Sequence, residues 1–222
     1  MATFAQKTFS ASSYATFRPS YPPKLYTTVL NYHQGPRNTL LDLGCGHGLV
    51  SRALAPHFPI VFGTDPSSNM IAQAKASGEN PPNINWKQAS AENLDFIEDG
   101  ALDMVVAGQA AHWFDFSKVW GEIQRKLRRG GTVAFWGYKD NLLVDFPEAT
   151  RVLDKYCYGE GKEFMGRFWE QPDERLRRLY GDEMFVEMLE VEPELRGKEG
   201  RDWRDVEVET EWGTVILLAR KL

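Results

Sequence analysis

The sequence predicts an α/β fold with a doubly wound, mostly parallel sheet, and three observations lead to this class. Short apolar runs typical of buried strands alternate with amphipathic stretches of helical spacing. The chain has 222 residues, which suits one α/β domain with a modest elaboration. Hydrophobic residues make up 42% of it, enough to fill a sizeable core. The alternation therefore predicts helices on both faces of one sheet.

Four segments of a single domain follow one another along the chain. Residues 1–36 form an N-terminal segment in which Pro22-Pro23 opens a helix. The core follows over residues 37–138. Residues 139–203 break the alternation and are predicted as a helical insertion, placed to form a lid. Residues 204–222 alternate again and are predicted as a closing hairpin.

The core is expected to contain five strands, each a short apolar run bounded by turn residues: 38–44, 60–65, 84–88, 102–107 and 132–136. Helices are predicted over residues 49–54, after the N-cap residue Ser67, and over 116–127. Gly130-Gly131 is expected to stop the last of these helices. In the closing hairpin, the turn is predicted at Trp212-Gly213, and the terminal strand is expected to be antiparallel.

Composition argues against several functional classes. The formal net charge of −5 argues against a dedicated nucleic-acid binder. No apolar run approaches 18 residues, so no membrane span is expected. The polar segment after Met1 differs from a signal peptide, and Cys45 and Cys157 form no disulfide framework, so a reduced, cytoplasmic location is expected. The four histidines have no metal-like spacing, so no metal site is expected.

A glycine-rich turn is expected between the first core strand and the helix after it. LLDLGCGHG over residues 40–48 has the spacing G-x-G-x-G, whereas the dinucleotide fingerprint G-x-G-x-x-G would need glycine in place of Leu49. Asp65 ends the second strand, where a carboxylate can accept hydrogen bonds from both hydroxyls of a ribose. The turn and the acid together favour a nucleoside site. The alternatives are an ordinary tight turn and, for Asp65, a helix cap beside Pro66.

Further stretches make the chain resemble class I methyltransferases that use S-adenosylmethionine. They are the acid after the second strand, SAENL from residue 90 and LRRGG before the fifth strand. FSASSYATFRPSYP over residues 9–22 and QAAHWFD over 109–115 resemble the trans-aconitate methyltransferase group, which carries the type 11 domain. The resemblance is close over residues 4–140 and includes the ending WGTVILLARK.

The resemblance implies a Rossmann-like methyltransferase fold, S-adenosylmethionine as cofactor and a small-molecule acceptor. Asp65 would hold the ribose hydroxyls, Met70 would flank the adenine, and Asp42 would approach the methionine amino group. S-adenosylmethionine has a flat base and a cationic sulfur but no phosphate, so a site with carboxylates and apolar walls would suit it. The residues assigned to the cofactor are Asp42, Gly44, Cys45, Gly46, Asp65, Pro66, Met70, Ala91, Glu92 and Gln109, with Tyr14 and Arg18 in the covering N-terminal segment.

The transfer site is expected after the fourth strand, at the sheet edge where ligands bind in such folds. His112 is the candidate catalytic base for a hydroxyl acceptor, whereas a carboxylic acid is ionised at neutral pH and needs none. Ligand contact or simple packing are the alternatives for His112. The residues proposed to bind the acceptor are Trp113, Trp136, Tyr138, Phe168 and Trp169. For Trp136, the alternative is packing in the core.

The predicted reaction is methyl transfer from S-adenosylmethionine to a small organic acceptor, such as a carboxylate oxygen. Residues 176–180 run directly into 181–185, as though part of the family's lid were absent. An incomplete lid leaves open a first alternative, a non-catalytic cofactor-binding protein that regulates or binds a partner. A nicotinamide-dependent oxidoreductase is the second alternative. Leu49 counts against the second. Net charge and the resemblance disfavour methylation of RNA or protein, and the oligomeric state is left open.

Overall fold

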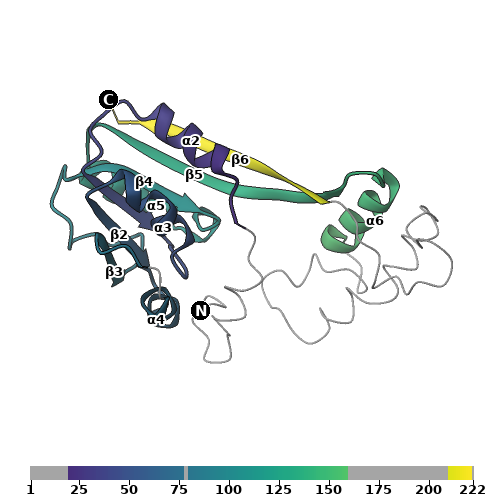
Figure 1. Cartoon of the computed structure of the whole chain (residues 1–222), viewed down its shortest axis with the longest axis horizontal. Coiled ribbons are helices and arrows are strands. Elements are labelled where there is room, and N and C mark those ends of the chain that lie inside the picture. Colours follow the sequence, from purple (N-terminus) through teal and green to yellow (C-terminus); the bar gives the residue numbers. More distant parts are fainter. Residues whose placement is uncertain (1–19, 78–79, 160–209, 222) are drawn as a thin grey trace. The chain divides into compact units, whose positions relative to one another are not determined.

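The computed structural model describes residues 20–77, 80–159 and 210–221 (Figure 1). The chain divides into two compact units. The first comprises Met1–Gly137 and Val215–Leu222, and the second comprises Tyr138–Thr214. Phe168, Trp169, Tyr14, Arg18 and the join at residues 176–185 lie outside the described residues.

The described strands form one sheet with the order β3-β2-β1-β4-β5-β6. Their bounds are β1 Thr39–Leu43, β2 Ile60–Asp65, β3 Ile84–Gln88, β4 Leu102–Gly108, β5 Leu127–Leu143 and β6 Thr210–Arg220. β1 to β5 pair in parallel. At the antiparallel terminal strand, Lys221 accepts from the Gly130 N–H at 2.8 Å and donates to the Gly131 carbonyl at 2.9 Å. The strand order reverses beside β1, which confirms the doubly wound prediction.

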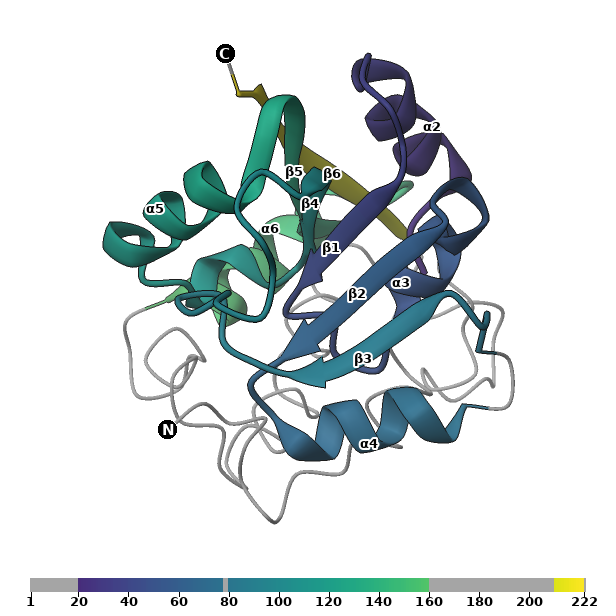
Figure 2. The ribbon, with the colours of Figure 1, turned by 90° about the vertical axis from the view of Figure 1, so that its left-hand side faces the viewer.

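The described helices are α2 Pro23–Tyr32, α3 Leu49–Leu54, α4 Ser68–Ala76, α5 Phe116–Lys126 and α6 Pro147–Tyr158, with 3-10 turns at η2 Ala55–His57 and η3 Ala111–Trp113. Three of them, α3, α4 and α5, connect consecutive parallel strands, whereas α2 precedes β1, α6 follows β5, and β3 passes to β4 without a helix. α4 packs beside β2 and β3 (Figure 2). The Ser67 hydroxyl accepts a hydrogen bond from the Met70 N–H at 3.4 Å, which confirms the predicted N-cap. None of the helices in the described ranges is long and apolar enough to cross a membrane.

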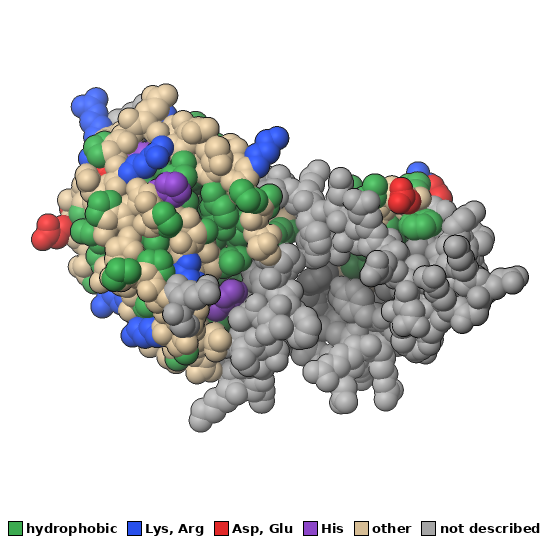
Figure 3. Space-filling view, viewed as in Figure 1, with side chains coloured by type: hydrophobic (Ala, Val, Ile, Leu, Met, Phe, Trp, Pro, Cys, Tyr) green, Lys and Arg blue, Asp and Glu red, His purple; other side chains and the backbone are tan. Residues whose placement is uncertain are grey.

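On one face of the first unit, the described basic side chains stand apart from one another. On the face in Figure 3, the Lys and Arg side chains of the described residues are scattered around the unit. A clustered basic patch or stripe is the electrostatic footprint of a nucleic-acid-binding domain. This face of the described surface therefore lacks that footprint.

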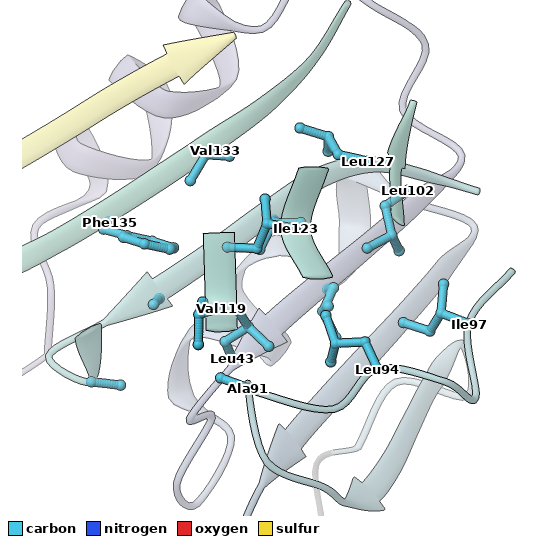
Figure 4. Packing of buried hydrophobic residues seen from close by; sticks show 14 residues of the cluster. Leu43, Ala91, Leu94, Ile97, Leu102, Val119, Ile123, Leu127, Val133 and Phe135 are labelled. Atoms are coloured by element: carbon cyan, nitrogen blue, oxygen red, sulfur yellow. The ribbon is translucent and has the colours of Figure 1, made fainter. Parts of the chain in front are cut away.

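One layer of the core of the first unit lies between the sheet and α5. Val119 and Ile123 of α5 are almost completely buried against Leu43 of β1 and Val133 and Phe135 of β5 (Figure 4). Strand residues alternate between the two faces of the sheet, whereas helix residues three or four apart share one side. These two periodicities allow both elements to contribute to one apolar layer.

The helix stop predicted at Gly130-Gly131 is wrong. α5 ends at Lys126, and β5 begins at Leu127 and runs through both glycines. The pairing register with β4 shifts between Leu102 and Met104, and Gly130 adopts a φ of +77°. Gly130 therefore lies at an irregularity in the pairing of β5 with β4, and Lys221, directly after β6, forms hydrogen bonds with the backbone of both glycines.

The turn predicted at Trp212-Gly213 is also wrong. β6 is continuous over Thr210–Arg220. A single glycine does not interrupt a strand whose backbone pairs with a long neighbour, and β5 extends to Leu143. Residues 204–209 of the predicted hairpin lie outside the described part of the chain.

The second unit contains a helix where a helical insertion is predicted. The insertion begins as the last residues of β5 and continues into α6, Pro147–Tyr158. Ala149, Val152 and Tyr156 of α6 are buried and pack with Leu143 and Phe146. This unit therefore has a small apolar cluster of its own.

The α5 layer provides a test of the core. Replacing Ile123 with alanine should lower the free energy of unfolding by about 3 kcal/mol, because the change leaves a cavity among fully buried neighbours. Urea denaturation of the purified protein measures this. Gln124→Ala on the exposed side of the same helix is the matched control and should change stability little. Equal losses in both variants would contradict this account of the core.

Candidate functional site

The first unit contains a cavity of about 360 Å³ where β1, β2 and β4 end. Its volume falls within the range of small-molecule sites in proteins. The carboxyl edge of a doubly wound sheet, beside the reversal of strand order, is also where ligands bind in this fold class. The position and the size therefore mark this cavity as the candidate site.

The glycine loop, residues 44–48, forms one wall of the cavity. Gly44 has a φ of +65°, and a Cβ there would stand 2.6 Å from the Ala110 Cβ. Only glycine fits such a backbone beside the chain that follows β4. The Cys45 N–H donates to the Thr64 carbonyl at 2.8 Å, which ties the loop to β2. The loop is therefore held against the ends of two neighbouring strands.

Asp65, at the end of β2, holds the loop through its side chain. Its Oδ2 accepts from the Gly46 N–H at 3.0 Å, and its Oδ1 accepts from the Ser67 N–H at 2.8 Å. Burial raises the pKa of this carboxyl, and the two backbone donors act in the opposite direction. Each carboxylate oxygen has a second lone pair, so Asp65 can accept further hydrogen bonds from a ligand in the cavity.

Asp42, on β1, is 1% exposed and lines the same cavity. Its Oδ2 accepts from the Ser51 hydroxyl at 2.6 Å. Burial raises the pKa of Asp42 to about 7, and the nearby Asp65 charge adds to the rise, although Ser51 lowers it. Asp42 therefore binds a proton more readily than an ordinary carboxyl and would interact favourably with a cation.

Two further ionisable side chains, those of Cys45 and Glu92, line the cavity. Burial and the Asp42 and Asp65 charges raise the pKa of the Cys45 thiol, so Cys45 stays neutral. Burial acts to raise the pKa of Glu92, but hydrogen bonds from the Ser90 hydroxyl and the Asp115 N–H outweigh it, and the pKa is lowered. Glu92 is therefore the carboxylate of the cavity that ionises most easily.

Gln109 follows β4 and has a backbone conformation that residues other than glycine rarely adopt. Its φ is +54°, and its N–H donates to the Trp136 carbonyl at 2.8 Å. Among the described residues it is the only non-glycine with a positive φ. Such strain clusters at binding sites, where the surrounding structure holds it in place.

Most of the predicted cofactor residues come together in this cavity. Ten of them line it: Asp42, Gly44, Cys45, Gly46, Asp65, Pro66, Met70, Ala91, Glu92 and Gln109. Trp113, predicted to contact the acceptor, lines it as well. Sequence reasoning did not assign the other lining residues: Tyr21, His47, Leu49, Val50, Ser67, Gly108, Ala110 and Phe114.

Three predicted residues lie elsewhere. His112 is exposed on η3, with its ring centroid 5.0 Å from that of Trp113, and is not among the residues that line the cavity. Trp136 is 4% exposed and packs edge-on against Tyr21, with centroids 5.8 Å apart. This placement agrees with the core-packing alternative for Trp136. Tyr138 belongs to the second unit.

The described lining is acidic. It contains three carboxyl side chains but neither lysine nor arginine among the described residues. In the same part of the chain, no three His, Cys, Asp or Glu side chains are grouped so that they could hold a metal ion. A site with these carboxyl side chains favours a cationic ligand, while Leu49 and Val50 also bring the first turn of α3 to the cavity, where backbone N–H groups can bind an anionic group.

Comparisons with known proteins agree with this geometry. Residues 41–135 match the family described as a methyltransferase domain. A Saccharomyces cerevisiae protein named as an S-adenosylmethionine-dependent methyltransferase is 35% identical over 190 residues, which cover 84% of this chain and 65% of that protein. A Dictyostelium discoideum protein named as a methyltransferase is 30% identical over 178 residues, covering 80% and 63%. The chain thus spans less than two thirds of the length of these relatives.

Solved structures show the same fold. A structure titled as a type II methyltransferase from Anaeromyxobacter dehalogenans superposes with a TM-score of 0.65 at 25% identity. The match covers 92% of this chain and 98% of that one. A Methanococcus maripaludis structure, titled as an S-adenosyl-L-methionine-dependent methyltransferase, gives 0.53 at 25% identity, covering 81% and 80%.

The raised pKa of Asp42 predicts a pH dependence of stability. The unfolded-state value is near 4, so the protonated carboxyl stabilises the fold at low pH, and this contribution is lost as pH rises from about 4 to about 7. Asp42→Asn should remove this loss, which is on the order of a few kcal/mol. Urea denaturation without ligand at pH 5 and pH 8, in both proteins, measures the difference. If the free energy of unfolding falls by the same amount from pH 5 to pH 8 in both proteins, Asp42 is not the group responsible for the loss.

Proposed function

We propose that the protein is an S-adenosylmethionine-dependent methyltransferase that transfers a methyl group to a small organic acceptor, because residues 41–135 match a methyltransferase domain family and the chain is similar to a protein named as such an enzyme. The main support for this proposal is the acidic cavity at the strand ends. The glycine loop and Asp65 both line it, and the Gly46 N–H donates to the Asp65 carboxylate. The described walls of the cavity offer carboxylates for a cation and apolar surfaces for a flat base.

The residues present fit this cofactor. The Asp65 carboxylate is oriented by its two backbone donors and keeps lone pairs, so it would accept hydrogen bonds from the ribose hydroxyls. Met70 and Ala91 are nearly fully buried apolar residues of the lining and would contact the adenine. Asp42 would face the methionine amino group. The bound cofactor supplies a methyl group on a cationic sulfur, which is a strong leaving group.

The chain's own contribution is to hold the reactants in line and to exclude water. A direct displacement at carbon needs the nucleophile, the methyl group and the sulfur aligned, so no catalytic triad is required. The glycine loop, the strained backbone of Gln109 and the Asp65 carboxylate would fix one side of that line. Trp113 would form a wall of the acceptor side.

The acidic lining also separates this proposal from the nicotinamide alternative. A dinucleotide carries a pyrophosphate, which the ionised carboxylates of the lining would repel, and Glu92 is the one that ionises most easily. Position 49, where the dinucleotide fingerprint has its third glycine, is Leu49, which itself lines the cavity. The cavity therefore favours a cofactor with a cation and no phosphate.

We propose a carboxylate oxygen as the acceptor atom, by the resemblance to trans-aconitate methyltransferases. A carboxylic acid is ionised at neutral pH and needs no general base. The placement of His112, exposed and outside the lining of the described cavity, is compatible with such an acceptor. His112 remains the candidate base for a hydroxyl acceptor.

Asp65→Ala tests the cofactor half of the proposal. The variant should weaken S-adenosylhomocysteine binding about 100-fold, because two hydrogen bonds to a charged group are lost. Isothermal titration calorimetry on the wild type and the variant measures this. Glu98→Gln, at an exposed carboxyl, is the matched control and should bind like the wild type. No heat with the wild type at high micromolar ligand would refute the cofactor, and equal binding by Asp65→Ala would remove that residue from the site.

A panel of acceptors tests the other half. Small carboxylic acids should yield S-adenosylhomocysteine when mixed with the enzyme and S-adenosylmethionine, whereas phenols and amines of similar size should not. His112→Ala should keep the rate with acids within about tenfold, since loss of a general base costs about 10²–10⁴. Turnover of phenols that His112→Ala abolishes would instead establish a base-assisted hydroxyl acceptor. Binding of cofactor without any turnover would favour the non-catalytic alternative.

A further inference from the structure

Trp86, on the edge strand β3, lies across two glycines. In the parallel pairing it stands opposite Gly63 of β2. A Cβ at Gly63 would stand 2.5 Å from the Trp86 Cε3, and a Cβ at Gly48 would stand 2.9 Å from its Cζ3. Real Cβ atoms do not approach neighbours this closely, so the indole occupies the space that both side chains would need. The ring therefore joins β2 to the end of the glycine loop.

Arg52, on α3, holds the same end of the loop through hydrogen bonds. Its Nη2 donates to the His47 carbonyl at 2.7 Å, and its Nη1 donates to the Asn80 Oδ1 at 3.3 Å. Its guanidinium carbon lies 5.9 Å from the centroid of the Trp86 ring. An arginine at this distance from an indole is attracted to the ring. The loop carbonyl is thus fixed by a group that Trp86 helps to orient.

Asn80 extends this connection to the end of α4. Its Nδ2 donates to the carbonyls of Ala74 and Ser77, each at 2.9 Å. α4 carries Met70, which lines the cavity, and the loop carries Gly46 and His47, which line it as well. Arg52 with Asn80 therefore links two parts of the lining from outside it. We call Trp86, Arg52 and Asn80 the loop brace.

We propose that Trp86 and Arg52 are positioning residues that hold the glycine loop in the form that binds the cofactor. The inference rests on the proposed function, because it concerns the affinity of the same cavity. Neither residue is among those that line the cavity, so both act through the loop and not by touching the ligand. A tenfold loss of affinity follows from a small displacement of a binding wall, whereas folding depends mainly on the fully buried core.

A double-mutant cycle between residues 63 and 86 tests this proposal. Gly63→Ala alone should displace the Trp86 ring and weaken S-adenosylhomocysteine binding about tenfold. In the Trp86→Ala background the added methyl group meets no ring and only the Ser51 Oγ, 2.9 Å from the Cβ position, so Gly63→Ala should then cost clearly less affinity than in the wild type. Coupling of this size is typical of residues in contact. Calorimetric dissociation constants of the four proteins, each measured well below its own melting temperature, give the coupling.

Further variants separate positioning from general destabilisation. Trp86→Phe should recover part of the affinity lost in Trp86→Ala, and Arg52→Gln should weaken binding while keeping a near-wild-type melting temperature. Phe96→Ala is the matched control, since Phe96 is also a half-buried aromatic packed on β2, through Phe62, and is not among the residues that line the cavity. It should lower the melting temperature without changing the dissociation constant.

The two proposals fail in different ways. Wild-type protein that does not bind S-adenosylhomocysteine would refute the proposed function. Wild-type protein that binds, together with Trp86→Ala, Gly63→Ala and Arg52→Gln variants that bind equally well, would overturn the loop brace alone. Additive losses at residues 63 and 86 would overturn it as well, because two residues that act through one contact must be coupled.

Discussion

The carboxylate of Asp65 is the contact on which the candidate site depends. It accepts one backbone N–H from the glycine loop and another from the residue that caps α4. The pairing of Leu43 with Thr64 brings β1 and β2 to an end side by side, so the loop after β1 reaches the acid at the end of β2. One side chain thus sets the distance between two walls of the cavity. The same carboxylate keeps lone pairs for a ligand, which makes the wall itself a binding group.

Burial of like charges gives the cavity its chemical preference. Asp42 and Asp65 are both removed from water and both line the same cavity, and each has a raised pKa because burial penalises its ionised form. Among the described residues, no lysine or arginine in the lining relieves this penalty. A cation in the cavity would relieve it, whereas a phosphate would increase it. The charge of the lining therefore supports a sulfonium cofactor independently of the comparisons.

Local patterns predicted the parts of the molecule that local chemistry decides. Strand β2, the N-cap at Ser67 and the meeting of the glycine loop with Asp65 follow from apolar periodicity and turn residues. The errors arise where a distant partner decides. Gly130-Gly131 lies inside a strand because β6 pairs with it, and Gly213 does not form a turn because β6 continues alongside β5.

Several residues of the site had no local signal for the same reason. Trp86 looks like an ordinary strand residue until the strand order places it over Gly48 and Gly63. Tyr21 lies in the N-terminal segment that the resemblance places over the cofactor, but the sequence did not single it out as a lining residue, and its side chain is 5% exposed and lines the cavity. In a reaction that needs alignment more than acid–base chemistry, residues that fix a wall can affect the rate as much as residues that touch the ligand. If the glycine loop is the wall against which the reactants are aligned, as proposed, the loop brace would contribute to the function as well as to the fold.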